Sequence, residues 1–223
     1  MNQPDLSRIT EFNGYSLITD PDDHGVSEAI REHHVWEKPT TEKLIELLKP
    51  KMTFVDCGAH IGYYTLLASS IVGLEGWVYA FEPSPHNRAF LLANIMYNHS
   101  NNIVVYPFIL HLSCGFMRFT ERIAGNTGDS YIERDSNSQS PLIRSVTLDS
   151  LFQPNTVDVI KIDCQGSDNT IVEGGKRLLT ESSDIKVFYE SDCRSILERC
   201  GYTHFTDLTT GEGPSTFATK YVM

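Results

Sequence analysis

A carboxylate precedes a glycine-containing loop in the stretch 56–62, which reads DCGAHIG. An apolar run at 53–55 comes before it, and residues 63–68 continue it with a helical pattern. A strand, a glycine loop and a helix in this order predict a nucleotide-type binding corner. Asp56 would repel a pyrophosphate but attract an ammonium or sulfonium group, by roughly 4 kcal/mol at about 4 Å and an effective dielectric of about 20. The spacing therefore predicts a pocket for S-adenosylmethionine, which is a cationic adenosine derivative.

A second carboxylate follows the next predicted strand. Glu82 comes directly after the β-forming run at 77–81. In folds of this type an acid at that position bonds the hydroxyls of a ribose. The alternative is that Glu82 interacts with the dipole of the helix that begins at Ser84 and Pro85. His60 is expected to offer its backbone N–H from the loop.

Two further acids follow later strands. Asp163 comes after the predicted strand at 157–162, and Glu190 after the one at 185–189. Because open α/β sheets bind ligands beyond the carboxyl ends of their strands, both side chains are candidates for orienting or deprotonating an acceptor group. A Mg²⁺ site at this pair is possible but not favoured. A third interpretation is that acids here only cap the helices that follow.

Strands and helices alternate along most of the chain. This pattern predicts an α/β three-layer sandwich with a Rossmann-like, seven-stranded, mostly parallel sheet. The strands are expected at 53–55, 77–81, 103–108, 157–162, 185–189, 204–208 and 217–222. The helices are expected at 26–36, from Thr40 or Thr41 to about 48, and at 62–72, 84–97, 168–179 and 192–200. The short turn at 209–213 requires the last two strands to form an antiparallel hairpin.

Two parts of the chain depart from the alternation. Residues 1–25 are expected to form an irregular arm, and 1–50 together to pack on a core domain at 51–223, so that the chain forms a single domain overall. Residues 111–147 predict a β-excursion with mobile loops. It is either a decorative hairpin or a flap over the substrate pocket, because long loops in compact domains are often functional.

The composition restricts the function classes. The chain has 223 residues and a net charge of −11, without a cluster of Lys and Arg, which argues against a nucleic-acid substrate. Its five cysteines include no CxxC pair, so reduced thiols are expected and zinc is not. The N-terminus lacks a signal pattern, and no apolar stretch approaches the ~20 residues that span a bilayer. The sequence predicts a soluble, cytoplasmic protein with a small-molecule partner, and it indicates no oligomeric state.

Four segments together resemble the FkbM-like family of S-adenosylmethionine-dependent methyltransferases: 54–65, 78–85 with Asn87, 146–151 and 157–163. The resemblance covers roughly residues 35–205. It implies the class I methyltransferase fold and, usually, O-methylation of a hydroxyl on a small molecule or sugar. The residues then expected to bind the cofactor are Glu37, Asp56, Gly58, Ala59, His60, Gly62, Tyr63, Glu82, Pro83, Ser84, Asn87 and Asp163. Asp163 is the predicted catalytic residue, with Glu190 as its helper.

The sequence departs from the family pattern after the fourth predicted strand. Such families commonly continue as Asp-x-Glu-Gly-x-Glu, whereas this chain has Gln165 and Asp168 at the two glutamate positions. A catalytically weak or non-catalytic subunit that binds the cofactor or supports assembly is therefore one alternative. An N-methyltransferase of the same fold is another. A nicotinamide-dependent dehydrogenase is disfavoured because the loop lacks the third glycine of the dinucleotide fingerprint.

Overall fold

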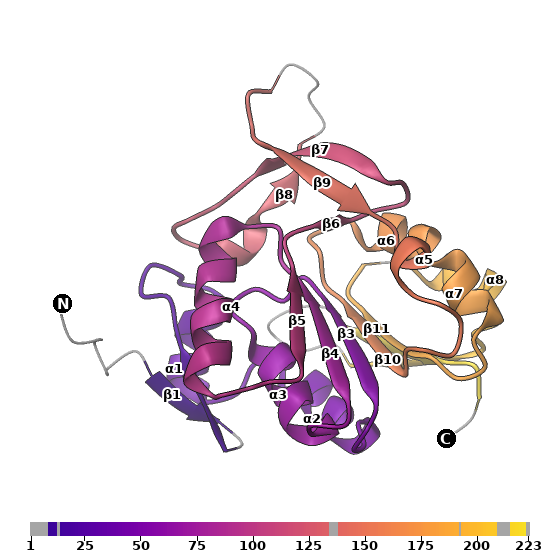
Figure 1. Ribbon diagram of the computed structural model, residues 1–223, viewed down its shortest axis with the longest axis horizontal. Helices are drawn as coiled ribbons and strands as arrows, with labels where there is room; N and C mark the ends of the chain where they lie inside the picture. The colour runs from indigo at the N-terminus through magenta and orange to yellow at the C-terminus, as the bar shows by residue number, and fades with distance from the viewer. Residues whose placement is uncertain (1–8, 13, 134–137, 192, 209–214, 222–223) are drawn as a thin grey trace.

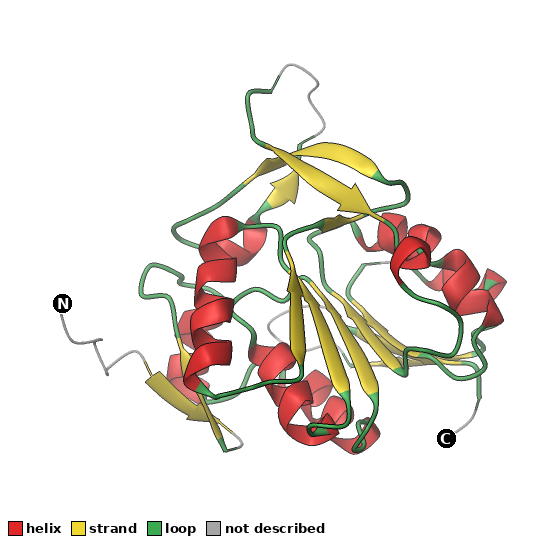
Figure 2. Ribbon diagram, viewed as in Figure 1, coloured by secondary structure: helices red, strands yellow, loops and turns green. Residues whose placement is uncertain are grey.

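A seven-stranded sheet crosses the centre of the computed structural model and is covered by helices on both faces (Figures 1 and 2). The structure describes residues 9–12, 14–133, 138–191, 193–208 and 215–221. Along the sheet the strands are β12 (His204–Asp207), β13 (Thr216–Thr219), β11 (Lys186–Tyr189), β10 (Val159–Ile162), β3 (Thr53–Cys57), β4 (Trp77–Phe81) and β5 (Ile103–Tyr106). The last five are parallel, whereas β13 runs antiparallel to both β11 and β12. The predicted sandwich and its antiparallel C-terminal strands are confirmed; the turn expected at 209–213 lies outside the described residues.

The sheet separates two apolar layers because neighbouring residues of a strand face opposite sides. One layer contains Val55, Ile160 and Val187, and the other contains Phe54, Val159 and Phe188. All six side chains are fully or almost fully buried. The parallel pairing of β10 with β3 and β11 aligns Val55, Ile160 and Val187 in one row across the sheet, and it aligns Phe54 with Val159 in the next. The carboxyl ends of the central strands are thereby fixed side by side.

Eight α-helices are described. They are α1 (Val26–His33), α2 (Lys38–Leu47), α3 (Tyr63–Val72), α4 (Pro85–Tyr97), α5 (Leu148–Leu151), α6 (Asp168–Gly174), α7 (Lys176–Glu181) and α8 (Arg194–Arg199). The predicted start of α4 is confirmed, since the Ser84 side chain accepts a hydrogen bond from the backbone N–H of Asn87 and Pro85 occupies the first turn.

The continuous helix expected at 168–179 is wrong. It divides at the glycine pair into α6 and α7. A Cβ at Gly174 would lie 2.2 Å from the carbonyl oxygen of His111, so this glycine lets the excursion's backbone pass close to the helix. Two consecutive glycines also weaken a helix, since each is about 1 kcal/mol less favourable than alanine.

The N-terminal arm is more regular than expected. β1 (Ile9–Phe12) and β2 (Tyr15–Ile18) form an antiparallel hairpin. The side chains of Asn94 on α4 and of Asn98 directly after it hold β2, each donating to a backbone carbonyl of that strand and accepting from a backbone N–H. The expectation of an irregular arm is therefore wrong for residues 9–18, because two amides far along the chain replace the partners that a short edge hairpin lacks.

The excursion forms a sheet of its own. β6 (Ile109–Leu110), β9 (Leu142–Val146), β7 (Gly115–Thr120) and β8 (Tyr131–Ile132) lie in that order, and a short 3-10 helix, Thr127–Asp129, precedes β8. Figure 1 shows this small sheet above the carboxyl ends of the central strands, at the top of the view. This is the position that the flap interpretation requires. None of the helices in the described part of the chain has the length and apolar character to span a lipid bilayer.

Candidate active site

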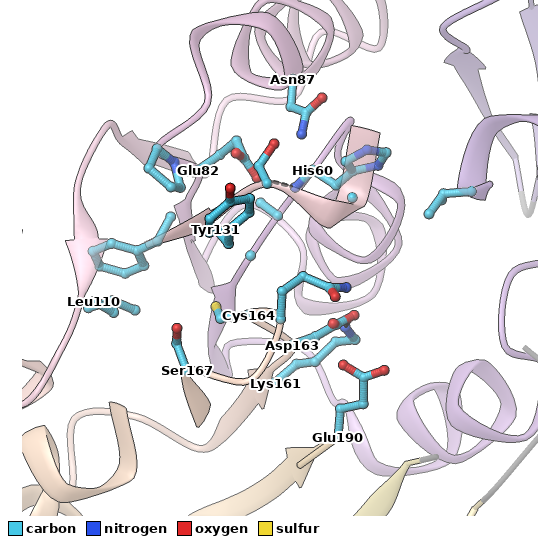
Figure 3. Close-up of a pocket in the computed structure, with 18 of the residues that line it drawn as sticks. His60, Glu82, Asn87, Leu110, Tyr131, Lys161, Asp163, Cys164, Ser167 and Glu190 are labelled. Carbon is cyan, nitrogen blue, oxygen red and sulfur yellow. Dashed lines mark hydrogen bonds and ion pairs between the residues drawn. The ribbon is translucent and has the colours of Figure 1, made fainter. Parts of the chain in front are cut away.

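A cavity of about 190 Å³ lies between the carboxyl ends of the central strands and the excursion. Figure 3 shows side chains from both parts around it. Its wall includes most of the predicted cofactor residues: Glu37, Gly58, Ala59, His60, Tyr63, Glu82, Pro83, Asn87 and Asp163. Glu190 also lines it, whereas the predicted residues Asp56, Gly62 and Ser84 do not.

Glu82 is held at the tip of β4 by two backbone N–H groups. Its Oε2 accepts from His60 at 2.8 Å, and its Oε1 accepts from Ser84 at 2.9 Å. Burial raises the pKa of this carboxyl to about 7, although both hydrogen bonds oppose the shift. Because each carboxylate oxygen has a second lone pair, Glu82 can still accept from ligand hydroxyls. The His60 N–H, which we expected to face a ligand, is instead committed to Glu82.

Asp56 lies beneath the loop rather than on the cavity wall. Its Oδ2 accepts a hydrogen bond from the Thr65 hydroxyl at 2.6 Å, and its side chain is 1% exposed within the protein. Its Oδ1 is buried without a hydrogen-bond partner. Burial raises the pKa of this carboxyl, while the positive charge of Lys161 opposes the rise. This position does not favour the predicted direct contact between Asp56 and a cationic ligand.

The loop glycines are required chiefly by packing. Gly58 has φ +85°, and a Cβ there would lie 2.0 Å from the carbonyl oxygen of Asp163. Gly62 has φ +98°, and a Cβ there would meet the Leu91 side chain at 2.6 Å. Both positions have left-handed backbone that favours glycine. These two glycines therefore accommodate close packing of the protein's own chain, and their predicted contact with the cofactor stays a prediction.

Two carboxyls and a lysine form the opposite end of the cavity. Lys161 Nζ lies 2.7 Å from Asp163 Oδ2, and the carboxyls of Asp163 and Glu190 both line the cavity and interact with each other. Burial opposes ionisation of Asp163, but Lys161 outweighs it and lowers the pKa of that carboxyl. Burial and the adjacent charge of Asp163 raise the pKa of Glu190 to about 8. The pair therefore contains one ionised carboxyl and one that binds a proton near neutral pH.

Lys161 is a functional candidate that the sequence reasoning missed. Its side chain is 5% exposed, and its Nζ lies 4.5 Å from the centre of the Tyr64 ring. The Tyr64 hydroxyl in turn donates to Glu37 Oε2 at 2.7 Å. The available signal was a single lysine among the apolar residues of the strand, and all four residues of that strand are buried in the structure. Because lysine is almost never fully buried without a partner, this position indicates a charged partner nearby.

Asp168 connects the tips of β10 and β11. Its Oδ1 accepts from the backbone N–H of Cys164, and its Oδ2 accepts from those of Glu190 and Ser191. The Asp168 carboxylate thus links the backbone after β10 to the backbone after β11. Shortening the family's glutamate to aspartate at this position leaves a residue that shapes the site without lining it.

The excursion supplies a wall that the sequence did not specify by residue. Its contributions include Leu110, Phe119, Asn126, Gly128, Ser130, Tyr131 and Ile132. Thr127 holds this wall in place: its hydroxyl lies 2.7 Å from His60 Nε2, its carbonyl accepts from Asn87 Nδ2, and its N–H donates to Asp23 Oδ1. The loop-like composition of 125–129 was the available signal.

Within the described residues, no group of three or more His, Cys, Asp or Glu side chains is placed to hold a metal ion.

Comparison with known proteins adds to this geometry. The family model described as the methyltransferase FkbM domain matches residues 56–204. No curated protein matches the chain. Among solved structures, methyltransferase FkbM from Methylobacillus flagellatus KT is similar with a TM-score of 0.55 and 18% identity, over 87% of this chain and 53% of its own, so this chain spans about half of that protein.

Two further solved structures share the fold. A SAM-dependent O-methyltransferase from Thermotoga maritima has a TM-score of 0.52 and 12% identity, over 93% of this chain and 74% of its own. A SAM-dependent methyltransferase from Aquifex aeolicus has a TM-score of 0.50 and 17% identity, over 90% of this chain and 95% of its own. At these identities the likeness establishes the class I methyltransferase fold.

Proposed function

Since this chain belongs to the FkbM methyltransferase family, we propose that it transfers the methyl group of S-adenosylmethionine to a hydroxyl of a small molecule or sugar. The observation that carries this proposal is one cavity with Glu82 at one end and the Asp163–Glu190 pair at the other (Figure 3). An elongated cofactor with a ribose and a cationic sulfur matches these two ends. The strand-end location of the cavity supports the same assignment.

The cofactor's adenosine part is assigned to the Glu82 end. Glu82 would accept hydrogen bonds from the ribose hydroxyls. The backbone of the loop residues from Gly58 to Tyr63 would lie against the same part of the cofactor. Asn87 is buried and its Oδ1 has no hydrogen-bond partner, so it is suited to accept from the ligand. Pro83 adds an apolar contact at the same end.

The methionine part is assigned to the Asp163 end, with Glu37 on the adjacent wall. Glu37 and Asp163 both raise the pKa of Lys161 through their negative charge. The same charges would favour the ammonium and sulfonium groups of the cofactor. Asp56 and Ser84 would act through the loop and the α4 cap, without touching the ligand.

The reaction is an in-line displacement. The acceptor oxygen forms a bond to the methyl carbon as the bond from that carbon to sulfur breaks, and the acceptor's proton passes to a base. Once ionised, Glu190 is suited to receive this proton because its carboxyl has a pKa near neutral, whereas Lys161 lowers the pKa of Asp163 and makes it a weaker base. A bound sulfonium would favour the ionised form of Glu190 and prepare it as the base. Positioning of the two reactants supplies several kcal/mol more.

Calorimetry with S-adenosylmethionine and with its demethylated product tests the cofactor assignment. We expect both to bind and a nicotinamide dinucleotide not to bind. Transfer of a labelled methyl group to a panel of hydroxylated and amine acceptors then tests the reaction. Binding without transfer to any acceptor would favour the non-catalytic alternative, and transfer only to amines would favour the N-methyltransferase. Mg²⁺ at the carboxyl pair stays a less favoured alternative, because Lys161 already neutralises Asp163.

We also propose that 1–50 and 51–223 act as one domain, which the attachment of β2 to α4 supports. The free thiols of Cys57, Cys114, Cys164 and Cys200 support action in a reducing compartment such as the cytoplasm.

A further inference from the structure

We propose that Lys161 is a positioning residue that keeps the proton of the Asp163–Glu190 pair on Glu190 in the ligand-free protein, and so determines which carboxyl must release a proton before it can act as the base. The catalytic role of this arrangement rests on the function proposed above. The position of the proton in the ligand-free protein does not, and it can be measured without any substrate.

The first step is that two adjacent, partly buried carboxyls do not both ionise near neutral pH. Two ionised groups repel each other, so in the ligand-free protein one of them keeps a proton. Asp163 and Glu190 are in such contact on the cavity wall. The pair alone does not determine which oxygen carries the proton.

The second step is that Lys161 approaches only one of the two carboxyls within ion-pair distance. Its Nζ lies 2.7 Å from Asp163 Oδ2, and no ion pair of Lys161 with Glu190 is found among the described residues. Lysine itself cannot accept this proton, because the negative charges of Asp163, Glu37 and Asp56 keep its ammonium protonated although burial opposes this. Figure 3 shows the side chains of Lys161, Asp163 and Glu190 close together at one end of the cavity. The proton therefore stays on Glu190.

The third step is that the lysine is fixed in place. Its side chain is almost fully buried, and its ammonium lies over the Tyr64 ring at 4.5 Å, which adds a cation–π attraction. It cannot leave Asp163 without giving up both contacts. A mobile surface lysine would not impose such an asymmetry.

Other charged or titratable groups also face the pair. Glu190 is subject to the charges of Asp163, Asp168 and Lys161. Asp163 is subject in addition to His60, and Lys161 to Glu37 and Asp56. Asp168 disfavours ionisation of Glu190 whether or not Lys161 is present. Without the positive charge of the lysine to offset this repulsion, the pKa of Glu190 should rise.

The test is a titration of side-chain carboxyl resonances in the full ligand-free chain, labelled with ¹³C at Asp and Glu. The E190Q and D163N variants assign the two resonances. We expect the wild-type Glu190 signal to titrate near pH 8. In K161M we expect the midpoint to rise by about one pH unit or more, because the cation that favours ionisation is gone. K161R should stay within about 0.3 units of the wild type, since it keeps the charge.

K43M is the matched control. Lys43 also lies over an aromatic ring, that of Phe217, and pairs with an acid, Glu46, but not at this cavity. Its loss should leave the Glu190 midpoint unchanged. An unchanged or lowered midpoint in K161M, or an equal rise in K43M, would overturn the proposal.

D163N provides a second arm that keeps Lys161, and it applies even if K161M does not fold. With the neighbouring negative charge removed and the lysine retained, the Glu190 midpoint should fall by at least about one pH unit. A midpoint that stays near pH 8 would contradict the proposal. Failure of the wild-type protein to bind S-adenosylmethionine in calorimetry would instead contradict the proposed function, while leaving the titration result intact.

Discussion

The carboxylate of Glu82 accepts a hydrogen bond of 2.8 Å from the backbone N–H of His60. This contact joins the tip of β4 to the loop that follows β3, and His60 adopts a left-handed conformation, with φ of 52°, at that point. The acid assigned to the ribose is therefore placed by the same loop that would surround the cofactor. A substitution in the loop should therefore also shift the Glu82 carboxylate.

Replacing Glu82 with glutamine should weaken binding of S-adenosylmethionine by about tenfold or more, because one acceptor oxygen becomes a donor facing the ribose. Isothermal calorimetry with the wild type and E82Q measures this ratio. Glu75→Gln is the control, since Glu75 is exposed and pairs with Lys51 away from the cavity. Equal affinities for E82Q and the wild type would contradict the assignment.

Glu82 should also make stability depend on pH. Its pKa is raised to about 7 in the folded protein from an ordinary value of 4.5. The unfolded chain therefore ionises this carboxyl first, so the stability it contributes is present below about pH 4.5 and is lost as pH rises to about 7, by about 3 kcal/mol in total. Denaturant unfolding at several pH values should show this decline in the wild type and a shallower one in E82Q. Parallel curves would argue against a perturbed Glu82.

Gly58→Ala should destabilise the fold strongly. The new Cβ would lie 2.0 Å from the Asp163 carbonyl oxygen. The alanine would also have to adopt a backbone φ of +85°. Gly73→Ala is a matched control, because its φ is +67° and nothing lies within 4 Å of the new Cβ. Alanine at positive φ alone costs about 1 kcal/mol. We expect G58A to lose at least 2 kcal/mol more than G73A in denaturant unfolding, an order-of-magnitude figure for backbone overpacking.

Thr65→Val should destabilise the protein by about 1–3 kcal/mol, because it removes the side-chain hydrogen bond to a buried carboxylate whose Oδ1 has no hydrogen-bond partner among the described residues. Thr65→Ser keeps the hydroxyl and should recover most of the loss. Comparison of the two variants by thermal and denaturant unfolding separates the hydrogen bond from the methyl group. If the serine variant is as unstable as the valine variant, the methyl contact is the important term.

Tyr131→Ala should weaken ligand binding in the cavity by about tenfold, since an aromatic ring is removed from its wall. Phe116→Ala is the control: it lies on β7 of the same small sheet, is 71% exposed and does not line the cavity. Calorimetry with S-adenosylmethionine, followed by KM for an acceptor once one is found, measures both variants. Equal effects of the two substitutions would argue that the excursion affects binding only through its own folding.

Much of the fold could be predicted because the central strands are short apolar runs bounded by turn residues. The start of α4 at Ser84 and Pro85 and the end of α3 at Val72 depend on local signals and were predicted correctly. The N-terminal hairpin was missed because Asn94 and Asn98, far along the chain, hold it in place. The helix at 168–179 was wrongly extended because the close approach of His111 to Gly174 is a tertiary contact.

The candidate site was only partly predictable for the same reason. Glu82, Asp163 and Glu190 could be placed because strand ends of a parallel sheet meet at one edge. Lys161 was missed because its significance depends on burial against Tyr64, which local sequence does not reveal. Asp56 was assigned to the cavity because its position in the loop is right, whereas its side chain turns toward Thr65.

Trp36 and Glu37 line the cavity, yet they lie upstream of residues 56–204, which the family model matches. One side of the enclosure is therefore built by a segment that does not define the family. Substitutions on that side can therefore change the enclosure around the ligand while the segment that identifies the family stays unchanged.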